Sequence, residues 1–282
     1  LPFALSTSDE GRFLTNAPIV QYATKNDYGT LAIAPIGGLE LAYIKFTYTL
    51  TDGSTIDQKV DRNFTNGAYT SASSSSKSAF IYIGCFPGNL RNWSGTFQPL
   101  IAAGTLESYT VQCFNASDQV LSESIKINLL CPNTKGYEPI RLTWLNQYGT
   151  WDYYTFNMKS SKMISTKGST YQQLEGSWND STYKVDSFRG GKKAFRVNAT
   201  EKITMNTDFV NESETAWFEE LINSPEVFIL NGYDTSEPAF SLGNINALLN
   251  TYVIPVRLTT SSYTRKTIAN DKIMQYTFEV EK

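Results

Sequence analysis

Apolar and polar residues alternate along much of the first half of the chain, which is the pattern of half-buried β-strands. In residues 42–50, branched and aromatic residues occupy every second position before a turn at 51–54. The pattern predicts strands over residues 42–50, 80–86, 107–114 and 120–130. Several short strands separated by turns at this spacing are typical of a β-sandwich of immunoglobulin-like size, which we expect over residues 1–132.

Proline and glycine interrupt the pattern at residues 131–136, the best candidate boundary between two domains. Beyond it, residues 140–156 predict two strands around a turn at 146–149, where Gly149 supplies a positive φ. Further strands are expected as a pair within residues 192–205 and singly over 227–230, 252–258 and 274–280. The second domain, residues 133–282, is therefore predicted to be β-rich.

One short helix is predicted in this second half, over about residues 212–223. Asn211 can cap it, and Glu214 stands three residues later, as in a capping box. An apolar stripe follows, and Ser224-Pro225 ends the helix; the stripe comprises Trp217, Phe218, Leu221 and Ile222. The fold class is thus mainly β, with an N-terminal immunoglobulin-like β-sandwich and a C-terminal β-rich domain that holds one short helix.

Composition narrows the possible chemistry. The 282 residues include no histidine and 3 cysteines, so the chain lacks the imidazole that serine and cysteine hydrolases use and that many metal sites need. It also lacks a phosphate-binding glycine motif and a carboxylate pair suited to glycoside cleavage. We therefore predict that the protein is not an enzyme and holds no cofactor and no metal.

The cysteines and the net charge bear on compartment and partners. Cys85, Cys113 and Cys131 are odd in number and lack Cys-x-x-Cys spacing, so buried free thiols are favoured over one Cys113–Cys131 or Cys85–Cys113 bridge. No run of 18 apolar residues occurs, and a net charge of -3 is too small to attract a membrane or nucleic acid in bulk. We expect no membrane partner and no specific nucleic-acid partner.

The best candidate binding surface consists of Trp144, Tyr148, Trp151, Asp152 and Tyr153. Aromatic rings beside a carboxylate suit contact with a sugar, and Asp152 is the best single acid for it. Aromatic strands are, however, more often part of a core, because aromatic side chains dominate core burial. Both interpretations stay open at this point.

Charged residues separate into two neighbouring segments, which we treat as candidate assembly patches. The basic patch comprises Lys184, Arg189, Lys192, Lys193 and Arg196, and the acidic patch comprises Asp208, Glu212, Glu214, Glu219 and Glu220. No Lys or Arg occurs between Ile203 and Val256. Such segregation suits a head-to-tail contact between identical subunits, or alternatively neutralisation within one domain. The basic patch could also stack on single-stranded nucleic acid, although a solvated hairpin is favoured.

One block of the second half resembles a signature of structural proteins of tailed bacteriophages. The block is Leu142-Thr143-Trp144-Leu145-Asn146-Gln147-Tyr148-Gly149-Thr150-Trp151-Asp152-Tyr153-Tyr154-Thr155-Phe156, and the signature is a hydrophobic residue followed by Leu-Asn-x-x-Gly-x-Trp-Asp-x-x-x-Phe. The resemblance extends through residues 215–224 and 275–280 and covers residues 137–282. It implies a virion component of the tail or neck, with no catalytic residues to carry over.

Two functions of different classes follow. The first is a structural virion protein that assembles by protein–protein contacts into a ring or array. Its partners are copies of itself and other virion proteins, and its place is the virion, assembled in the host cytoplasm. The alternative is an extracellular carbohydrate-binding or adhesion module that contacts host-surface glycan through the region around Trp151. A hydrolase acting through Asp152 comes third.

Overall fold

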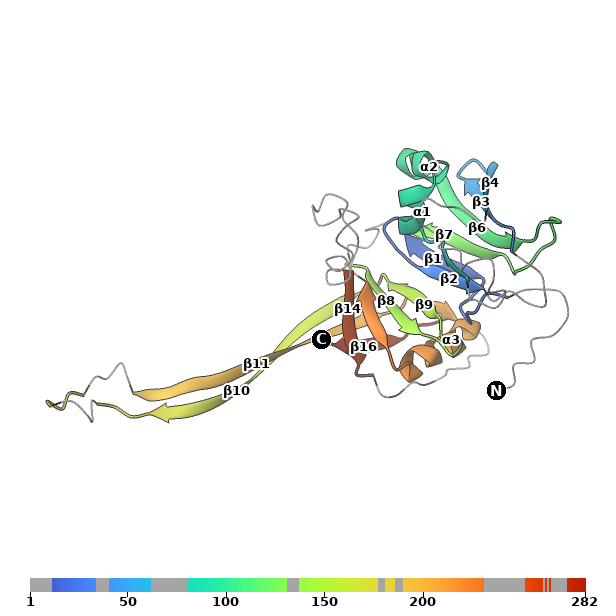
Figure 1. The fold of residues 1–282 in the computed structure, drawn as a ribbon. Helices are drawn as coiled ribbons and strands as arrows, with labels where there is room; N and C mark the ends of the chain where they lie inside the picture. The colour runs from blue at the N-terminus through green and yellow to red at the C-terminus, as the bar shows by residue number, and fades with distance from the viewer. Residues whose placement is uncertain are drawn as a thin grey trace, which may run out of the picture.

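The protein is mainly β, as the sequence predicts (Figure 1). The computed structural model describes residues 12–33, 41–61, 81–130, 137–176, 181–185, 190–230, 252–260, 262, 264 and 273–282. Buried apolar side chains form two clusters, one drawn from residues 13–127 and the other from residues 140–280. The expected boundary at 132/133 lies outside the described residues, so the division into two domains stays a prediction.

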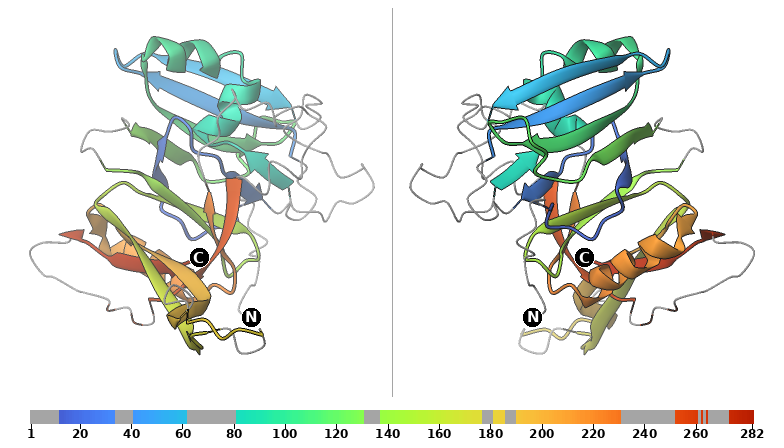
Figure 2. Two further views of the ribbon diagram at one scale, coloured as in Figure 1. Left: turned by 90° about the vertical axis from the view of Figure 1, so that its left-hand side faces the viewer. Right: turned by 90° about the vertical axis from the view of Figure 1, so that its right-hand side faces the viewer.

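The first half is built from two sheets around one core (Figures 1 and 2). The larger sheet has the order β1 (Val20–Thr24), β7 (Ile125–Leu130), β6 (Leu106–Phe114), β3 (Tyr43–Leu50) and β4 (Thr55–Asp61), with β1 parallel to β7 and the other pairs antiparallel. The smaller sheet pairs β2 (Thr30–Ile33) with β5 (Ile81–Gly84). In an immunoglobulin-like sandwich, strands G, F, C and C′ adjoin in one sheet and B and E in the other. Strands β7, β6, β3 and β4 take the first set of places, and β2 and β5 take the second.

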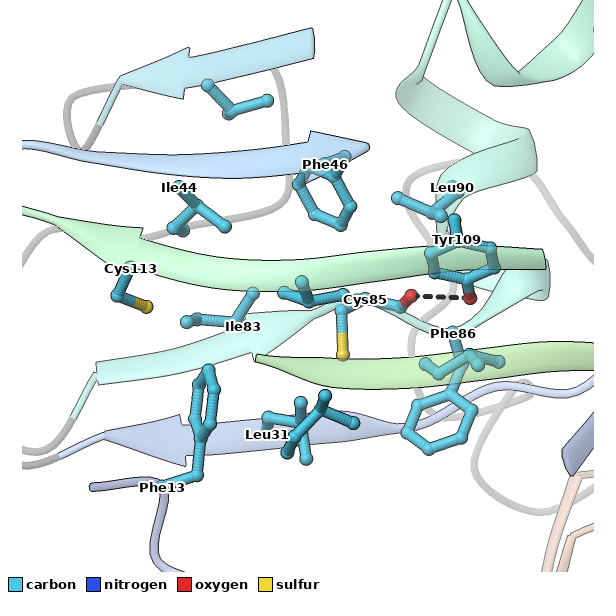
Figure 3. Close-up of a cluster of buried hydrophobic side chains, with 14 of the residues drawn as sticks. Phe13, Leu31, Ile44, Phe46, Ile83, Cys85, Phe86, Leu90, Tyr109 and Cys113 are labelled. Carbon is cyan, nitrogen blue, oxygen red and sulfur yellow. Dashed lines mark hydrogen bonds between the residues drawn. The ribbon is translucent and has the colours of Figure 1, made fainter. Parts of the chain in front are cut away.

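Alternating burial along the central strands builds this core (Figure 3). The inward-facing residues are Ile44, Phe46 and Tyr48 in β3 and Tyr109, Val111 and Cys113 in β6. The Tyr109 hydroxyl donates a hydrogen bond to the Cys85 carbonyl oxygen at 2.8 Å, so its burial leaves no unpaired donor. Burial also raises the pKa of this phenol, which therefore stays protonated.

Two short helices between β5 and β6 correct the prediction of a single helix. They are α1 (Pro87–Trp93) and α2 (Phe97–Ala103), in a stretch where the sequence pattern predicted no helix. Pro87 stands in the first turn of α1, a position where its missing N–H costs nothing. Each helix has seven residues and buries few apolar side chains, chiefly Leu90 and Phe97, so neither displays the apolar stripe that reveals a helix.

The two described cysteines are buried free thiols, as predicted. Cys85 follows β5 and Cys113 lies in β6, and both belong to the core of the first half. Cys131 lies outside the described residues.

These thiols are expected to be unreactive in the folded protein. Burial raises the pKa of Cys113 to about 12 and holds that of Cys85 well above its usual range. Since the thiolate is the nucleophile, a Cys131→Ser variant should not react with a thiol reagent at pH 8 until denaturant is added. Rapid labelling of either cysteine in the native variant would contradict this burial.

The second half contains a seven-stranded antiparallel sheet. Its order is β10 (Ser160–Gln173), β11 (Gly191–Asn206), β16 (Thr277–Glu281), β14 (Val253–Leu258), β13 (Val227–Leu230), β8 (Ile140–Leu145) and β9 (Trp151–Phe156). A separate pair joins β12 (Val210–Asn211) to β15 (Ile273–Met274). Between β8 and β9, Gly149 has φ 78°, as its place in the turn predicts.

The helix predicted at residues 212–223 is present as α3 (Glu212–Asn223). The Glu214 carboxylate accepts a hydrogen bond from the Asn211 backbone N–H at 2.6 Å, as a capping box requires. Trp217, Phe218 and Leu221 are buried against the second core. Helix α3 is thereby held on the sheet by its apolar side.

Strands β10 and β11 differ most from the sequence prediction. Residues 192–205 were expected to form two paired strands, but they belong to one continuous strand, β11. Its partner is β10, which the sequence pattern did not predict, and a bulge interrupts their register at Ser169/Thr170. Together β10 and β11 form a long ribbon, which we call the arm, that projects from the body of the protein (Figure 1).

Candidate functional site

The hairpin of β8 and β9 carries all five residues of the candidate binding surface. Trp144 lies opposite Asp152, and Thr143 lies opposite Tyr153. Since neighbouring residues of a strand face opposite sides, these two pairs point to different faces of the hairpin. All residues of β8 except its last are buried, which shows that both faces are covered. One face packs on α3 and the second core, and the other packs on the first half.

Asp152 is the centre of a buried polar network on the α3 side. Its carboxylate is 2% exposed and accepts three side-chain hydrogen bonds. The donors are Thr15 Oγ1 at 2.6 Å, Trp217 Nε1 at 2.7 Å and Asn146 Nδ2 at 3.0 Å. The network therefore joins the N-terminal segment, the hairpin turn and α3 through one carboxylate.

Asp152 should make the stability of the protein depend on pH. Desolvation raises its pKa to about 6, the three hydrogen bonds oppose the rise, and the charge of Glu220 adds to it. An unfolded Asp titrates near about 3.9, so the folded state binds this proton more tightly and stability falls as pH rises from about 4 to about 6. Urea titrations give the free energy of unfolding of the parent and of Asp152→Asn at each pH. The parent's value, relative to that of the variant, should drop by roughly 2–3 kcal/mol between pH 4 and pH 7. A constant difference would contradict this role for Asp152.

The N-terminal segment, residues 12–17, is fastened to the turn of the hairpin. Asn146 Nδ2 and Thr150 Oγ1 both donate to the Leu14 carbonyl oxygen, at 2.9 Å and 2.5 Å. The Tyr148 hydroxyl donates to Asn16 Oδ1 at 2.7 Å, and Asn16 Nδ2 donates in turn to Glu220 of α3. Residues from the start of the chain thus complete a structure that belongs to its second half.

Arg141 occupies the opposite face of the hairpin, toward the first half. It is 4% exposed, and its guanidinium carbon lies 4.7 Å from the Phe86 ring centroid and 5.2 Å from that of Tyr153. Arg141 Nε donates to the Tyr28 carbonyl oxygen at 2.9 Å, and Nη1 lies 3.3 Å from Asp27 Oδ2. Burial lowers the pKa of the guanidinium, and Asp27 opposes that effect. A buried ion pair therefore lies between the two halves.

The aromatic rings around Arg141 lie close to the backbone of Gly29 and to β2. The Tyr153 hydroxyl lies 3.0 Å from Thr30 Oγ1 of β2, and the Tyr153 ring contacts Phe86 at 5.5 Å between centroids. A side chain at Gly29 would come within 2.6 Å of the Phe86 ring, so a residue without Cβ fits here. Tyr153 thus belongs to the contact between the halves.

The candidate binding surface is therefore divided between two interfaces inside the molecule. Trp144 is 0% exposed, and its ring lies 5.0 Å from that of Trp217. Trp151 is half-buried, with its ring 5.7 Å from that of Phe228, and Tyr148 is half-buried beside Asn16. Trp144 and Asp152 have no access to a glycan, and the carboxylate of Asp152 already accepts three hydrogen bonds. Trp151 and Tyr148 retain partial exposure.

No protein-family model and no curated protein matches the chain. Among the described residues, no group of three or more Cys, Asp or Glu side chains is placed to hold a metal ion. The helices of the described part are also too short or too polar to cross a membrane.

The arm is the largest exposed feature of the described chain. Within β11, the stretch from Gly191 to Glu201 pairs with β10 alone among the described strands, because β16 pairs with β11 only from Lys202 to Asn206. At about 3.3 Å per residue, this free stretch is roughly 35 Å long. Large apolar side chains are exposed along the arm and near its tip, among them Met163, Ile164, Tyr171, Leu174, Phe195 and Val197.

The two faces of the arm differ in character, as the strand register shows. One face holds the buried Ile203 and Met205 and, further out, the exposed Ile164 and Val197. We call it the apolar face, and the register also places Lys162, Lys192 and Glu201 on it. The other, which we call the basic face, comprises Met163, Lys167, Tyr171, Lys193, Arg196 and Lys202. Strands β10 and β11 carry six Lys and Arg against one Glu, a net charge of +5, so the rest of the chain carries -8 of the total of -3.

The predicted basic patch lies on or near this arm. Lys192, Lys193 and Arg196 are residues of β11, and Lys184 belongs to the described stretch between the two strands. Arg189 lies outside the described residues. Lys192 and Lys193 make no hydrogen bond or ion pair with another described side chain, and Arg196 bonds to Asn198 of its own strand. Lys192 and Lys193 are thus available to a partner.

The predicted acidic patch lies on and just before α3. Asp208 precedes β12, and Glu212, Glu214, Glu219 and Glu220 are residues of α3. Burial raises the pKa of Glu214 and of Glu220, whose carboxylates accept hydrogen bonds from Asn211 and Asn16. Beside them Phe209 is 63% exposed, a large apolar side chain that the sequence pattern did not single out.

The ion pairs of the described residues do not join the two patches. The basic residues at the base of the arm pair elsewhere, Lys162 with Glu138 at 2.9 Å and Lys202 with Glu279 at 3.0 Å. Figure 1 shows the arm leaving the second half on the side away from α3. Lys192, Lys193 and Arg196 lie on the arm, away from α3, which favours the intersubunit interpretation of the charge pattern.

Proposed function

We propose that the chain is a non-enzymatic structural component of a bacteriophage virion, in the tail or neck region. It assembles by protein–protein contacts into a ring or array, with copies of itself and with other virion proteins. Its place is the virion, which is assembled in the host cytoplasm.

The observation that carries this proposal is the arm. A two-stranded ribbon is marginally stable in water by itself, because it buries little apolar surface. Its outer edges also present unpaired N–H and C=O groups, which are a template for pairing with another chain. Ile164 is 71% exposed and Phe195 79% exposed on this ribbon. These properties are costly in an isolated protein and useful in one whose arm is covered in an assembly.

The phage-like block supports the same proposal. Its residues build the junction between the N-terminal segment, the first half and α3, and the polar side chains of Asn146 and Asp152 bond to Leu14, Thr15 and Trp217 outside the block. Asp152, the best acid for hydrolysis or sugar contact, lies inside that junction. The block therefore ties these parts into one body, from whose sheet the arm extends.

The proposal is tested by locating the chain in its source. Particles banded on a density gradient should contain the whole chain, detected by mass spectrometry, in a fixed ratio to the major structural proteins. A variant in which Asn-Gly replaces residues 165–200 should fold, because the described core residues lie outside that segment, yet should stay in the unassembled fraction. Absence of the whole chain from the particles would contradict the proposed function.

A further inference from the structure

We infer that the basic face of the arm docks on the α3 side of a second copy of this chain, in a head-to-tail contact. The inference deepens the proposed function and rests on it, because it names the partner of the arm. The α3 side is defined here by Asp208, Phe209, Glu214, Glu219 and Glu226.

The basic face has the composition of a protein-binding surface. Exposed Met163 and Tyr171 stand among Lys167, Lys193 and Arg196, on the same side of the ribbon by register. Arg, Tyr and Met are enriched at protein interfaces, where aromatic rings and guanidinium groups supply most of the binding energy. This face is therefore suited to a partner that offers carboxylates around an apolar side chain.

The α3 side offers that combination. Exposed Phe209 follows Asp208 directly, and no Lys or Arg occurs between Ile203 and Val256. Asp208, Glu214 and Glu226 take part in no ion pair with a described residue. Charge complementarity between the arm and this side therefore selects a second copy of the same chain as the occupant.

The contact has to be made between copies. The arm extends away from the body, whereas α3 lies on the other side of the same half, as Figure 1 shows. A donor surface and a different acceptor surface on one chain form a heterologous contact, which repeats from copy to copy. Such repetition closes into a ring or continues as a helical tube, according to the rotation between copies.

A charge-reversal series tests the contact by sedimentation velocity of the purified whole chain over a range of concentrations. The parent should self-associate, and Lys167→Glu/Arg196→Glu should raise the dissociation constant by roughly tenfold or more. The matched control, Lys25→Glu/Lys126→Glu, reverses two exposed lysines of the first half and should associate like the parent. Circular dichroism should show all variants equally folded.

A compensating swap decides where the arm docks. The variant Asp208→Lys/Glu226→Lys should also dissociate, and the chain that combines all four substitutions should regain association, because the two reversed positions on each surface then again carry opposite charges. A parent that is monomeric at every concentration, reversals without effect, or a four-fold variant that stays dissociated would each overturn the inference. Self-association can fail while the chain is still found in particles, so this outcome is distinct from failure of the proposed function.

Discussion

The substitution Arg141→Ala is expected to lower the free energy of unfolding by about 3–5 kcal/mol. The guanidinium packs against two aromatic rings and donates to the Tyr28 carbonyl oxygen and to the Thr155 hydroxyl at 2.8 Å. Its removal leaves the carboxylate of Asp27, which is 91% covered, without a cation between the two halves. An uncompensated charge of this kind is among the most destabilising changes in a protein interior.

Urea unfolding with matched variants checks this expectation. Arg257→Ala is the control, because Arg257 forms an exposed ion pair with Glu281 whose loss should cost about 0–1 kcal/mol. The double variant Asp27→Asn/Arg141→Met removes both charges and should recover much of the loss. If Arg141→Ala and Arg257→Ala prove equally mild, the buried ion pair does not hold the halves together.

Trp144→Ala is expected to destabilise the protein by about 3–5 kcal/mol, through the cavity left in the second core. Trp144 packs against Trp217, whose ring also lies 5.9 Å from that of Tyr154. Trp151→Ala should cost less, because that ring is half-buried and contacts Phe228 at the edge of the body. The pair of substitutions thus compares a core residue with its half-exposed neighbour in the same hairpin.

The comparison is made by thermal and urea unfolding of the two variants, together with a glycan array. A core role for Trp144 predicts a large loss of stability that exceeds that of Trp151→Ala. A fully stable Trp144→Ala variant that loses binding to a particular glycan would contradict it and would revive the carbohydrate-binding alternative.

Local patterns predicted the parts of the fold that are half-buried. Strand β3 has every second residue in the core, and α3 has both a capping box and an apolar stripe, so each was visible in the sequence. Strand β10 is exposed on both faces and consists largely of Ser, Thr, Lys and Gln, so no alternation marks it. Its high Ser and Thr content was the one available signal.

The burial of the candidate site could not be predicted from the sequence. The sequence identified Trp144, Asp152 and Tyr153 as special, but their burial depends on contacts with residues more than 60 positions away in the chain. Thr15 and Trp217 lie on opposite sides of Asp152 in sequence, and Thr30 reaches Tyr153 from β2. Periodicity reports the local face of a strand and carries no information on what covers that face. The charge segregation, in contrast, was visible directly.

Hydrogen exchange of the arm amides, measured in the isolated chain and in the assembled particle, tests the central claim most directly. In the isolated chain, the amides of β10 and of β11 from Gly191 to Glu201 should exchange rapidly, because this ribbon has no core of its own. Amides of β3 serve as the control and should be protected in both states. Assembly should slow exchange along the arm while exchange in β3 is unchanged. Equal exchange of the arm in the two states would contradict its role as the assembly surface.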